Sequence, residues 1–373
     1  MRHLFTLAAL ALSLSIHAQD TYEFSTTVDL ASTPIISQGQ TGTCWSFSAS
    51  SFIESEIIRK TGKTIDLSEM YTVRQTYMDK AENYIMRQGK ANFSEGGLAH
   101  DVLNSIKANG LVPQDAYNGL DAGSSYHNHK EMVAILESML TTYVENPNKK
   151  LSKKWRATIN AVLDIYIGAT PETFTFEGKT YTPQSFSKMT SINPDDYVSL
   201  TSFTHEPFYS SFILNIPDNF SNGSFYNLPL DELIQTLKHS LANGYSVELD
   251  CDVSEPTFSA KHGLAVIPAD QRNNQVALDA IYPELDVTQQ YRQDEFENYT
   301  TTDDHLMHIT GMLKDQKGNT YYKVKNSWGN NSNYISNDGY INMSESYMRL
   351  KTISITLHKD AIPKNITKKL AIK

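Results

Sequence analysis

The chain has 373 residues, 42 acidic and 32 basic side chains, and a formal net charge of -10. No run of basic residues exceeds two, as at Lys368 and Lys369, so nucleic acids and anionic membranes are poor candidate partners. The length suffices for one large core or two smaller ones, and with two cysteines the chain does not depend on a disulfide scaffold.

Residues 1–18 have the features of a secretory signal peptide. Arg2 precedes an apolar run at residues 4–16, and Ala18 is a small residue at the expected cleavage site. The run is too short to cross a bilayer, although an uncleaved membrane anchor is the alternative. We therefore expect an exported protein, periplasmic or secreted, that begins near Gln19 and has no membrane contact after signal removal.

A glycine-containing turn precedes the most informative residue, Cys44. Residues 38–47 read Gln-Gly-Gln-Thr-Gly-Thr-Cys-Trp-Ser-Phe, and an amphipathic helical pattern then continues to Gly62. A cysteine reacts as its thiolate, and a helix N-terminus lowers the pKa of a thiol placed there. We predict that Cys44 is a nucleophile, with Gln38 close by; a buried structural thiol is the alternative.

Several further helices follow from apolar spacing and capping residues. Ser68 is a predicted N-cap, and Gly110 is predicted to end a third helix. Residues 132–143 and 155–166 each keep helical spacing, which predicts two antiparallel helices that pack on each other.

The chain beyond these helices alternates between unclear and clear patterns. Residues 173–227 are rich in Thr, Ser, Phe, Tyr and Asn, and their elements are not assigned. A helix is predicted at residues 230–241 and a half-buried strand at 247–251. Cys251 lies on the apolar face of that strand, which favours a buried structural thiol.

A hairpin near the C-terminal end brings a histidine and an asparagine together. Strands are predicted at residues 305–313 and 320–326, and antiparallel pairing places His305 opposite Asn326 or the residue two positions later. His308 lies three positions on and therefore points to the other face of the strand. His305 is thus the better candidate for a base.

A thiol, an imidazole and an amide in this chain order resemble the papain superfamily of cysteine peptidases, and within it the bleomycin hydrolase or aminopeptidase C branch. Thr41 stands where papain itself has a cysteine, and the absence of that disulfide fits this branch. Other segments similar to the branch are residues 110–113, 171–176, 251–253 and 339–344.

The resemblance implies an α+β, papain-like fold of two lobes with the active site in the cleft between them. The gap between Cys44 and His305 is longer than papain's by roughly 110–130 residues, which implies a helical insertion between the lobes. We therefore expect a helical lobe at residues 19–126, the insertion at 127–229, and a β-rich lobe with a C-terminal tail at 230–373.

The resemblance also assigns roles to single residues. Asn326 would orient His305, the indole of Trp328 would shield their hydrogen bond, and Gln38 would donate to the oxyanion. Gly96 and Gly97 would let a substrate backbone lie flat against them, because they have no side chains; a simple turn is the alternative. No metal-binding or phosphate-binding motif is recognised, and we expect neither metal nor cofactor.

The implied activity is hydrolysis of peptide bonds through a thioester. Relatives of this branch are aminopeptidases that assemble as homohexamers, with a C-terminal carboxylate that binds the substrate amine. This chain ends sooner, at Lys373, with a basic sequence, so endopeptidase action is an alternative. Acyl or amide transfer by the same three groups, or an inactive binding protein on this scaffold, are two more.

Overall fold

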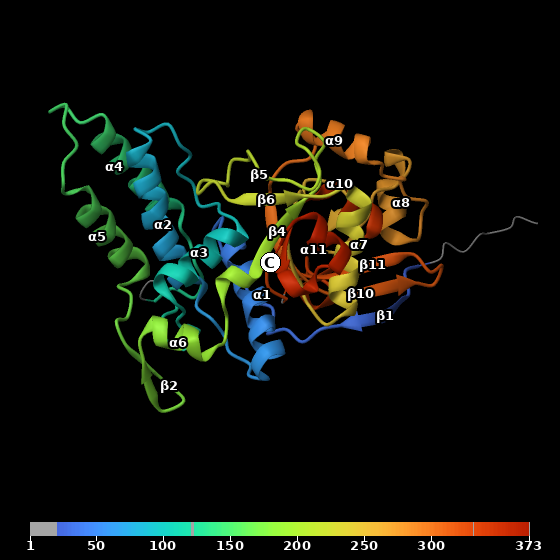
Figure 1. Ribbon diagram of the computed structural model, residues 1–373, viewed down its shortest axis with the longest axis horizontal. Helices are drawn as coiled ribbons and strands as arrows, with labels where there is room; N and C mark the ends of the chain where they lie inside the picture. Colours follow the sequence, from blue (N-terminus) through green and yellow to red (C-terminus); the bar gives the residue numbers. More distant parts are fainter. Residues whose placement is uncertain (1–20, 121–122, 331, 373) are drawn as a thin grey trace, which may run out of the picture.

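The chain places helices on one side and a large sheet on the other, with α1 between them (Figure 1). The computed structural model describes residues 21–120, 123–330 and 332–372. The helices are α1 (Cys44–Thr61), α2 (Glu69–Met86), α3 (Ala99–Asn109), α4 (Lys130–Val144), α5 (Trp155–Ile167), α6 (Pro183–Met189), α7 (Leu230–Ala242), α8 (Asn274–Asp279), α9 (Gln289–Glu297), α10 (Glu345–Lys351) and α11 (Lys364–Lys369). The strands are β1 (Phe24–Asp29), β2 (Phe174–Phe176), β3 (Lys179–Tyr181), β4 (Tyr197–Thr201), β5 (Ser211–Ile213), β6 (Ser224–Asn227), β7 (Val247–Cys251), β8 (Phe258–Ser259), β9 (Leu264–Ala265), β10 (His305–Asp315), β11 (Thr320–Lys325), β12 (Tyr340–Ser344) and β13 (Thr352–His358).

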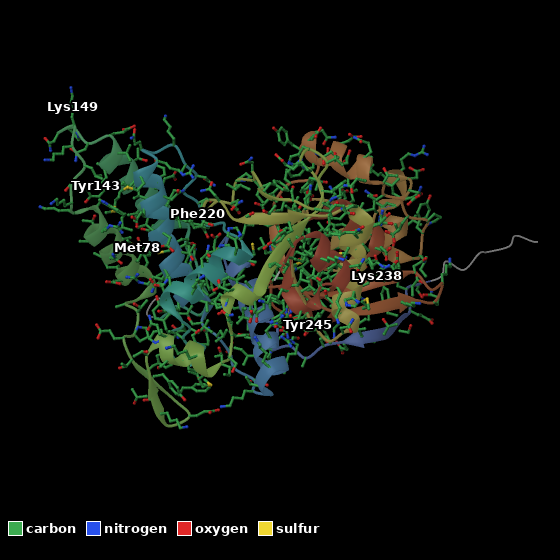
Figure 2. All side chains as sticks on the ribbon, viewed as in Figure 1. Met78, Tyr143, Lys149, Phe220, Lys238 and Tyr245 are labelled. Atoms are coloured by element: carbon green, nitrogen blue, oxygen red, sulfur yellow. The ribbon has the colours of Figure 1, made fainter. Side chains whose placement is uncertain are left out.

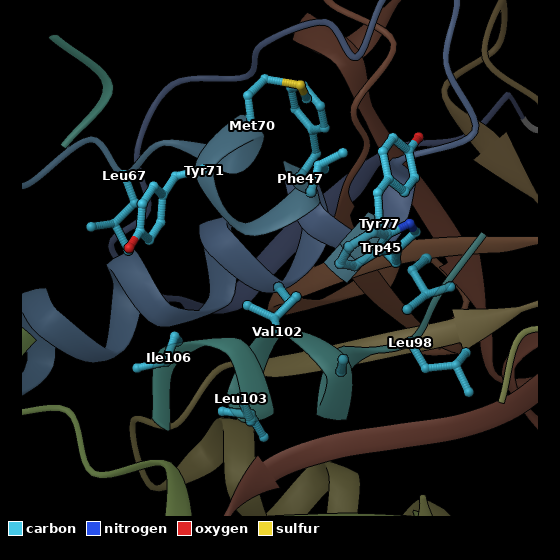
Figure 3. Packing of buried hydrophobic residues seen from close by; sticks show 14 of the residues in the cluster. Trp45, Phe47, Leu67, Met70, Tyr71, Tyr77, Leu98, Val102, Leu103 and Ile106 are labelled. Atoms are coloured by element: carbon cyan, nitrogen blue, oxygen red, sulfur yellow. The ribbon is translucent and has the colours of Figure 1, made fainter. Parts of the chain in front are cut away.

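The predicted start and stop of α1 and the predicted cap of α2 are confirmed. Helix α1 runs from Cys44 to Thr61 and is followed by Gly62, which has a φ of 70° and donates its N–H to a carbonyl of the last turn. Ser68 caps α2, since its hydroxyl accepts a hydrogen bond of 3.0 Å from the N–H of Tyr71. Figure 3 shows side chains of α1 and α2 packed together, with Trp45 beside the second helix.

The predicted antiparallel pair is present as α4 and α5. Tyr143 of α4 and Thr158 of α5 share a hydrogen bond of 2.8 Å between their hydroxyl groups, and Figure 2 places Tyr143 near α2. Arg74 of α2 binds Asp164 of α5 at 2.5 Å. These helices lie at the outer edge of the molecule, away from the sheet (Figure 1).

The main sheet has eleven strands in the order β5-β6-β4-β13-β7-β10-β11-β12-β9-β8, with β1 paired to β10. The hairpin β10–β11 is confirmed: His308 pairs with Lys325, and a bulge after Ile309 shifts the register by one residue. Helix α1 packs on one face of this sheet. Apolar side chains of β7 and β10 form a separate core with α7 on the other face.

Residues 173–227, whose elements were not assigned from the sequence, contribute to both the helical side and the main sheet. A small hairpin, β2–β3, packs with α6 through aromatic rings, whereas β4 and β6 join the main sheet. Three strands of the main sheet, β4, β5 and β6, therefore lie inside the expected insertion at 127–229. The domain boundaries stay a prediction, and the strand pairing favours an insertion that ends nearer residue 196.

The expected signal peptide, residues 1–18, lies outside the described residues. Among the described residues, no helix is both long and apolar enough to cross a membrane.

Candidate active site

Cys44 occupies the first position of α1, against the sheet. The first turn of α1 contains no acidic residue, so no side chain of that turn opposes the positive end of the helix dipole at the sulfur. The backbone N–H of Leu306 on β10 also faces the thiol. Because Leu306 follows His305, this contact brings the thiol to the strand end that carries the imidazole.

His305 is bound to Asn326 as the hairpin register predicted. Its Nε2 lies 2.8 Å from the Oδ1 of Asn326. Since that oxygen can only accept, Nε2 carries the hydrogen, and the other ring nitrogen, Nδ1, is left as the acceptor for a thiol proton. The ring of Trp328 covers the ring of His305, with 5.0 Å between their centroids, and Trp328 itself is 37% exposed.

His308 is on the opposite face of β10 from His305, where it packs against the middle of α1. It is fully buried, with its Nδ1 2.9 Å from the hydroxyl of Ser51 and its ring against Phe52. Strand periodicity therefore separates the two histidines as expected. His308 belongs to the packing between α1 and the sheet.

Gln38 is fixed between the segment before α1 and the residue after Asn326. Its Oε1 accepts a hydrogen bond of 2.6 Å from the hydroxyl of Ser327, and its Nε2 donates to the carbonyl of Thr41 at 2.7 Å. The backbone N–H of Gln38 also donates to the carbonyl of Ser327 at 2.8 Å. An amide nitrogen has two hydrogens, so one donor of Gln38 is still available to a ligand.

The glycine pair lies directly beside the nucleophile helix. A Cβ on Gly97 would approach the Trp45 ring to 3.0 Å, and Trp45 donates its indole N–H to the carbonyl of Glu95 at 2.9 Å. A Cβ on Gly96 would overlap the carboxylate of Asp218 at 2.0–2.3 Å. The pair therefore permits a close approach of other groups, and its contact with substrate stays a prediction.

Burial opposes charge on both central groups when each is taken alone. It raises the pKa of Cys44 to about 12 and lowers the pKa of His305 to about 4, although the hydrogen bond with Asn326 raises the latter. Burial alone therefore favours the neutral form of each group. A proton passing from sulfur to imidazole forms two opposite charges together, which offset each other's desolvation.

Three other polar residues near Cys44 have no marked signal in the sequence. Asp218 lies in the stretch 173–227, whose elements are not assigned from the sequence, and Asp303 precedes a second aspartate, Asp304. Asp304 is exposed and binds the hydroxyl of Thr302 at 2.7 Å. Ser327 holds Gln38, and only its place after Asn326 marked it.

One acidic cluster has donor atoms suited to a metal ion. Glu54, Asp66 and Glu69 place one oxygen each within 4.8 Å of one another. The ammonium group of Lys325 lies at this cluster and donates to Ser51 at 2.7 Å and to Thr33 at 3.0 Å. The lysine supplies a cation there, so we assign no metal to it.

Comparisons with known proteins agree with this geometry. A model of the Peptidase C1-like family matches residues 5–373. Aminopeptidase G of Lactobacillus delbrueckii subsp. lactis is 24% identical over 382 residues, which cover 92% of this chain and 84% of that protein. Cysteine proteinase 1, mitochondrial, of Saccharomyces cerevisiae (strain JAY291) is 23% identical over 405 residues, covering 95% and 80%. The crystal structure of PepW from Lactobacillus rhamnosis HN001 has a TM-score of 0.75 at 19% identity and covers 93% of this chain and 84% of its own. The expected α+β, papain-like class is thereby confirmed.

Proposed function

The chain belongs to the Peptidase C1-like family, and from that premise we propose that it is a cysteine aminopeptidase in which Cys44, His305, Asn326 and Gln38 do the chemistry. The observation that carries the assignment is the hydrogen bond between His305 Nε2 and Asn326 Oδ1 beside the helix that starts at Cys44. It leaves Nδ1 of His305 as the base.

In the first half of the reaction, Nδ1 of His305 takes the proton of the Cys44 thiol, and the sulfur attacks the carbonyl carbon of the peptide bond. The backbone N–H of Cys44 and the free N–H of Gln38 stabilise the oxyanion. The C–N bond then breaks, and the imidazolium gives its proton to the departing amine. This leaves a thioester at Cys44.

In the second half, His305 takes a proton from water as the oxygen attacks the thioester. Collapse of the second tetrahedral intermediate expels the sulfur, and the proton on the imidazole returns to it. Asn326 keeps the ring in one orientation through both halves. Trp328 excludes water from the hydrogen bond on which that orientation depends, because its ring covers His305.

Two of the similar proteins are named Aminopeptidase G and Aminopeptidase C, which supports amino-terminal rather than internal cleavage. The test uses the purified protein with one peptide in two forms, with a free and an acetylated amino terminus. Sequential release of residues from the free form alone supports an aminopeptidase. Equal internal cleavage of both forms would instead identify an endopeptidase.

Export and assembly are further proposals that rest on the sequence and the resemblance. We propose that residues 1–18 direct export and are removed near Gln19. Mass spectrometry of protein recovered outside the cytoplasm should find that new terminus, and an intact Met1 would contradict it. The implied homohexamer is tested by light scattering of the purified protein.

A further inference from the structure

Two carboxylates from distant parts of the chain flank the nucleophile. The carboxylate of Asp218 lies against Gly96, and Gly97 in turn lies on the ring of Trp45, the residue after Cys44. The segment that carries Asp218 precedes β6 and extends toward α2, where Lys80 lies 5.2 Å from the ring centroid of Phe220 (Figure 2). Asp218 is thus held at the helical side of the cleft.

Asp303 approaches from the sheet side, two residues before His305. Both oxygens of its carboxylate are buried, and neither accepts a hydrogen bond of normal geometry from the described residues, although the backbone N–H of Asp218 and the carboxyl of Asp250 lie close enough to interact with it. Its polar neighbours are Asp218 and the carboxyl of Asp250, which is itself buried. A buried carboxylate without a donor is costly, so this arrangement favours a cationic ligand.

A cavity of about 400 Å³ opens beside these groups. It is bordered by Pro217, next to Asp218, and by Asp303, and its other walls include Ile216, Phe296 and Tyr299. An apolar and aromatic wall with acidic groups at one end suits the first side chain and the amine of a peptide.

The local charges leave this site negative. Lys80 is a cation near Asp218, and it donates to the carbonyl of Gly96. Asp101 is engaged elsewhere, since it accepts hydrogen bonds from the N–H of Leu98 and the hydroxyl of Ser221. Asp303 faces carboxyl groups on both sides, and burial together with the Asp218 charge raises its pKa to about 7.

We propose that Asp218 and Asp303 bind the free α-ammonium group of the peptide substrate and so restrict cleavage to the amino-terminal end of the peptide. The proposal rests on the proposed function and adds the residues that select the substrate. Asp218 lies against Gly96, whose neighbour Gly97 packs on the residue after Cys44, and Asp303 is two residues from His305, so an ammonium between the two carboxylates stands close to the scissile carbonyl. A peptide that continued past this point would meet the loop that carries Asp218 and would leave Asp303 without its cation.

The last described segment lies away from this site. Ile366 and Leu370 are buried in the core that includes α7, and Lys369 binds Glu232 at 2.6 Å and Tyr209 at 3.2 Å. One charge of the basic C-terminal segment, that of Lys369, is therefore paired with residues outside this site.

The test compares wild type, Asp218→Asn, Asp303→Asn and the double variant, all full length. Asp304→Asn is the matched control, because its exposed carboxylate neighbours Asp303 in sequence but faces Thr302. Each protein is assayed on one peptide with a free and with an acetylated amino terminus. Binding of both peptides is also measured by calorimetry on the same variants in a Cys44→Ala background, where no turnover occurs.

We expect each substitution to lower kcat/KM for the free peptide by about ten- to a hundredfold, mainly through KM, because a charge-assisted hydrogen bond is lost. Hydrolysis and binding of the acetylated peptide should not fall, and Asp304→Asn should match wild type. Wild-type binding without preference for the free amine, or a preference that survives the double substitution, would overturn the proposal.

The two readouts separate this inference from the proposed function. Absence of turnover in wild type that still binds the free peptide selectively would reject the peptidase assignment and keep the amine site. Turnover of both peptide forms at equal rates would keep the peptidase assignment and reject the amine site. Thermal unfolding of each variant identifies any that lose activity through misfolding.

Discussion

Two groups of residues near Cys44 are brought together in different ways. His305 and Asn326 come from neighbouring strands of one hairpin and meet through its register. Gly96, Asp218 and Asp303 come from three segments far apart in the chain and meet only through tertiary packing, with Gly96 and Asp218 on the helical side and Asp303 on the sheet side. The base and its orienting amide, as proposed, are therefore placed by local structure, whereas the groups proposed to choose the substrate are placed by loops on a rigid scaffold.

The largest effect is expected from Cys44→Ala, because the thiol is the proposed nucleophile. Hydrolysis should fall to background, while the melting temperature changes little. Cys251→Ala is the matched control, since its thiol is buried with the core around α7. Activity above a few per cent in Cys44→Ala would place the nucleophile elsewhere.

The role assigned to His305 is tested by comparison with His308, which lies on the opposite face of the same strand. His305→Ala should lose activity by at least about a hundredfold, since proton transfer is removed. His308→Ala should keep most of its activity per folded molecule and lose stability, because His308 is packed against Ser51 and Phe52. The reverse outcome, in assays of activity and thermal unfolding, would show that the wrong face was assigned.

Gln38→Ala tests the oxyanion role. Loss of one such donor lowers kcat by about 10²–10³-fold, with little change in KM. Because Gln38 also binds Ser327, the control is Ser327→Ala, which removes that hydrogen bond and leaves the amide donor in place. A loss in the control as large as in Gln38→Ala would reduce Gln38 to a structural link between the two segments.

The smallest expected effect concerns a buried acid under α1. Burial raises the pKa of Glu248 from 4.5 to about 8, so the folded state favours the protonated form. Its contribution to stability is therefore full below about pH 4.5 and is lost as the pH rises through 8. Glu248→Gln should melt on the order of a few degrees higher than wild type at pH 9 and show less gain at pH 5.

The control for that prediction is Glu131→Gln on the exposed face of α4. It should shift the melting temperature equally little at both pH values. A gain for Glu248→Gln that is the same at pH 5 and pH 9 would mean that titration of this carboxyl does not limit stability.

The contrast between residues placed by local structure and residues placed by tertiary packing explains what could be predicted from the sequence. The start of α1 at Cys44, the cap at Ser68 and the hairpin that carries His305 all follow from patterns within a few residues. Strand β4 has five residues and pairs in parallel with β6 and antiparallel with the distant β13, so no local signal marked it. Asp218 could not be recognised from the sequence, because its environment depends on Gly96, more than a hundred residues earlier in the chain.

The central claim, that Cys44 is the activated nucleophile of this protein, is tested most directly by labelling with an epoxide-type thiol inhibitor followed by peptide mapping in the mass spectrometer. One adduct per chain is expected, located on Cys44 and lost together with activity in His305→Ala, while Cys251 remains unmodified. An adduct on Cys251, or full activity in a protein whose Cys44 is completely labelled, would contradict the claim.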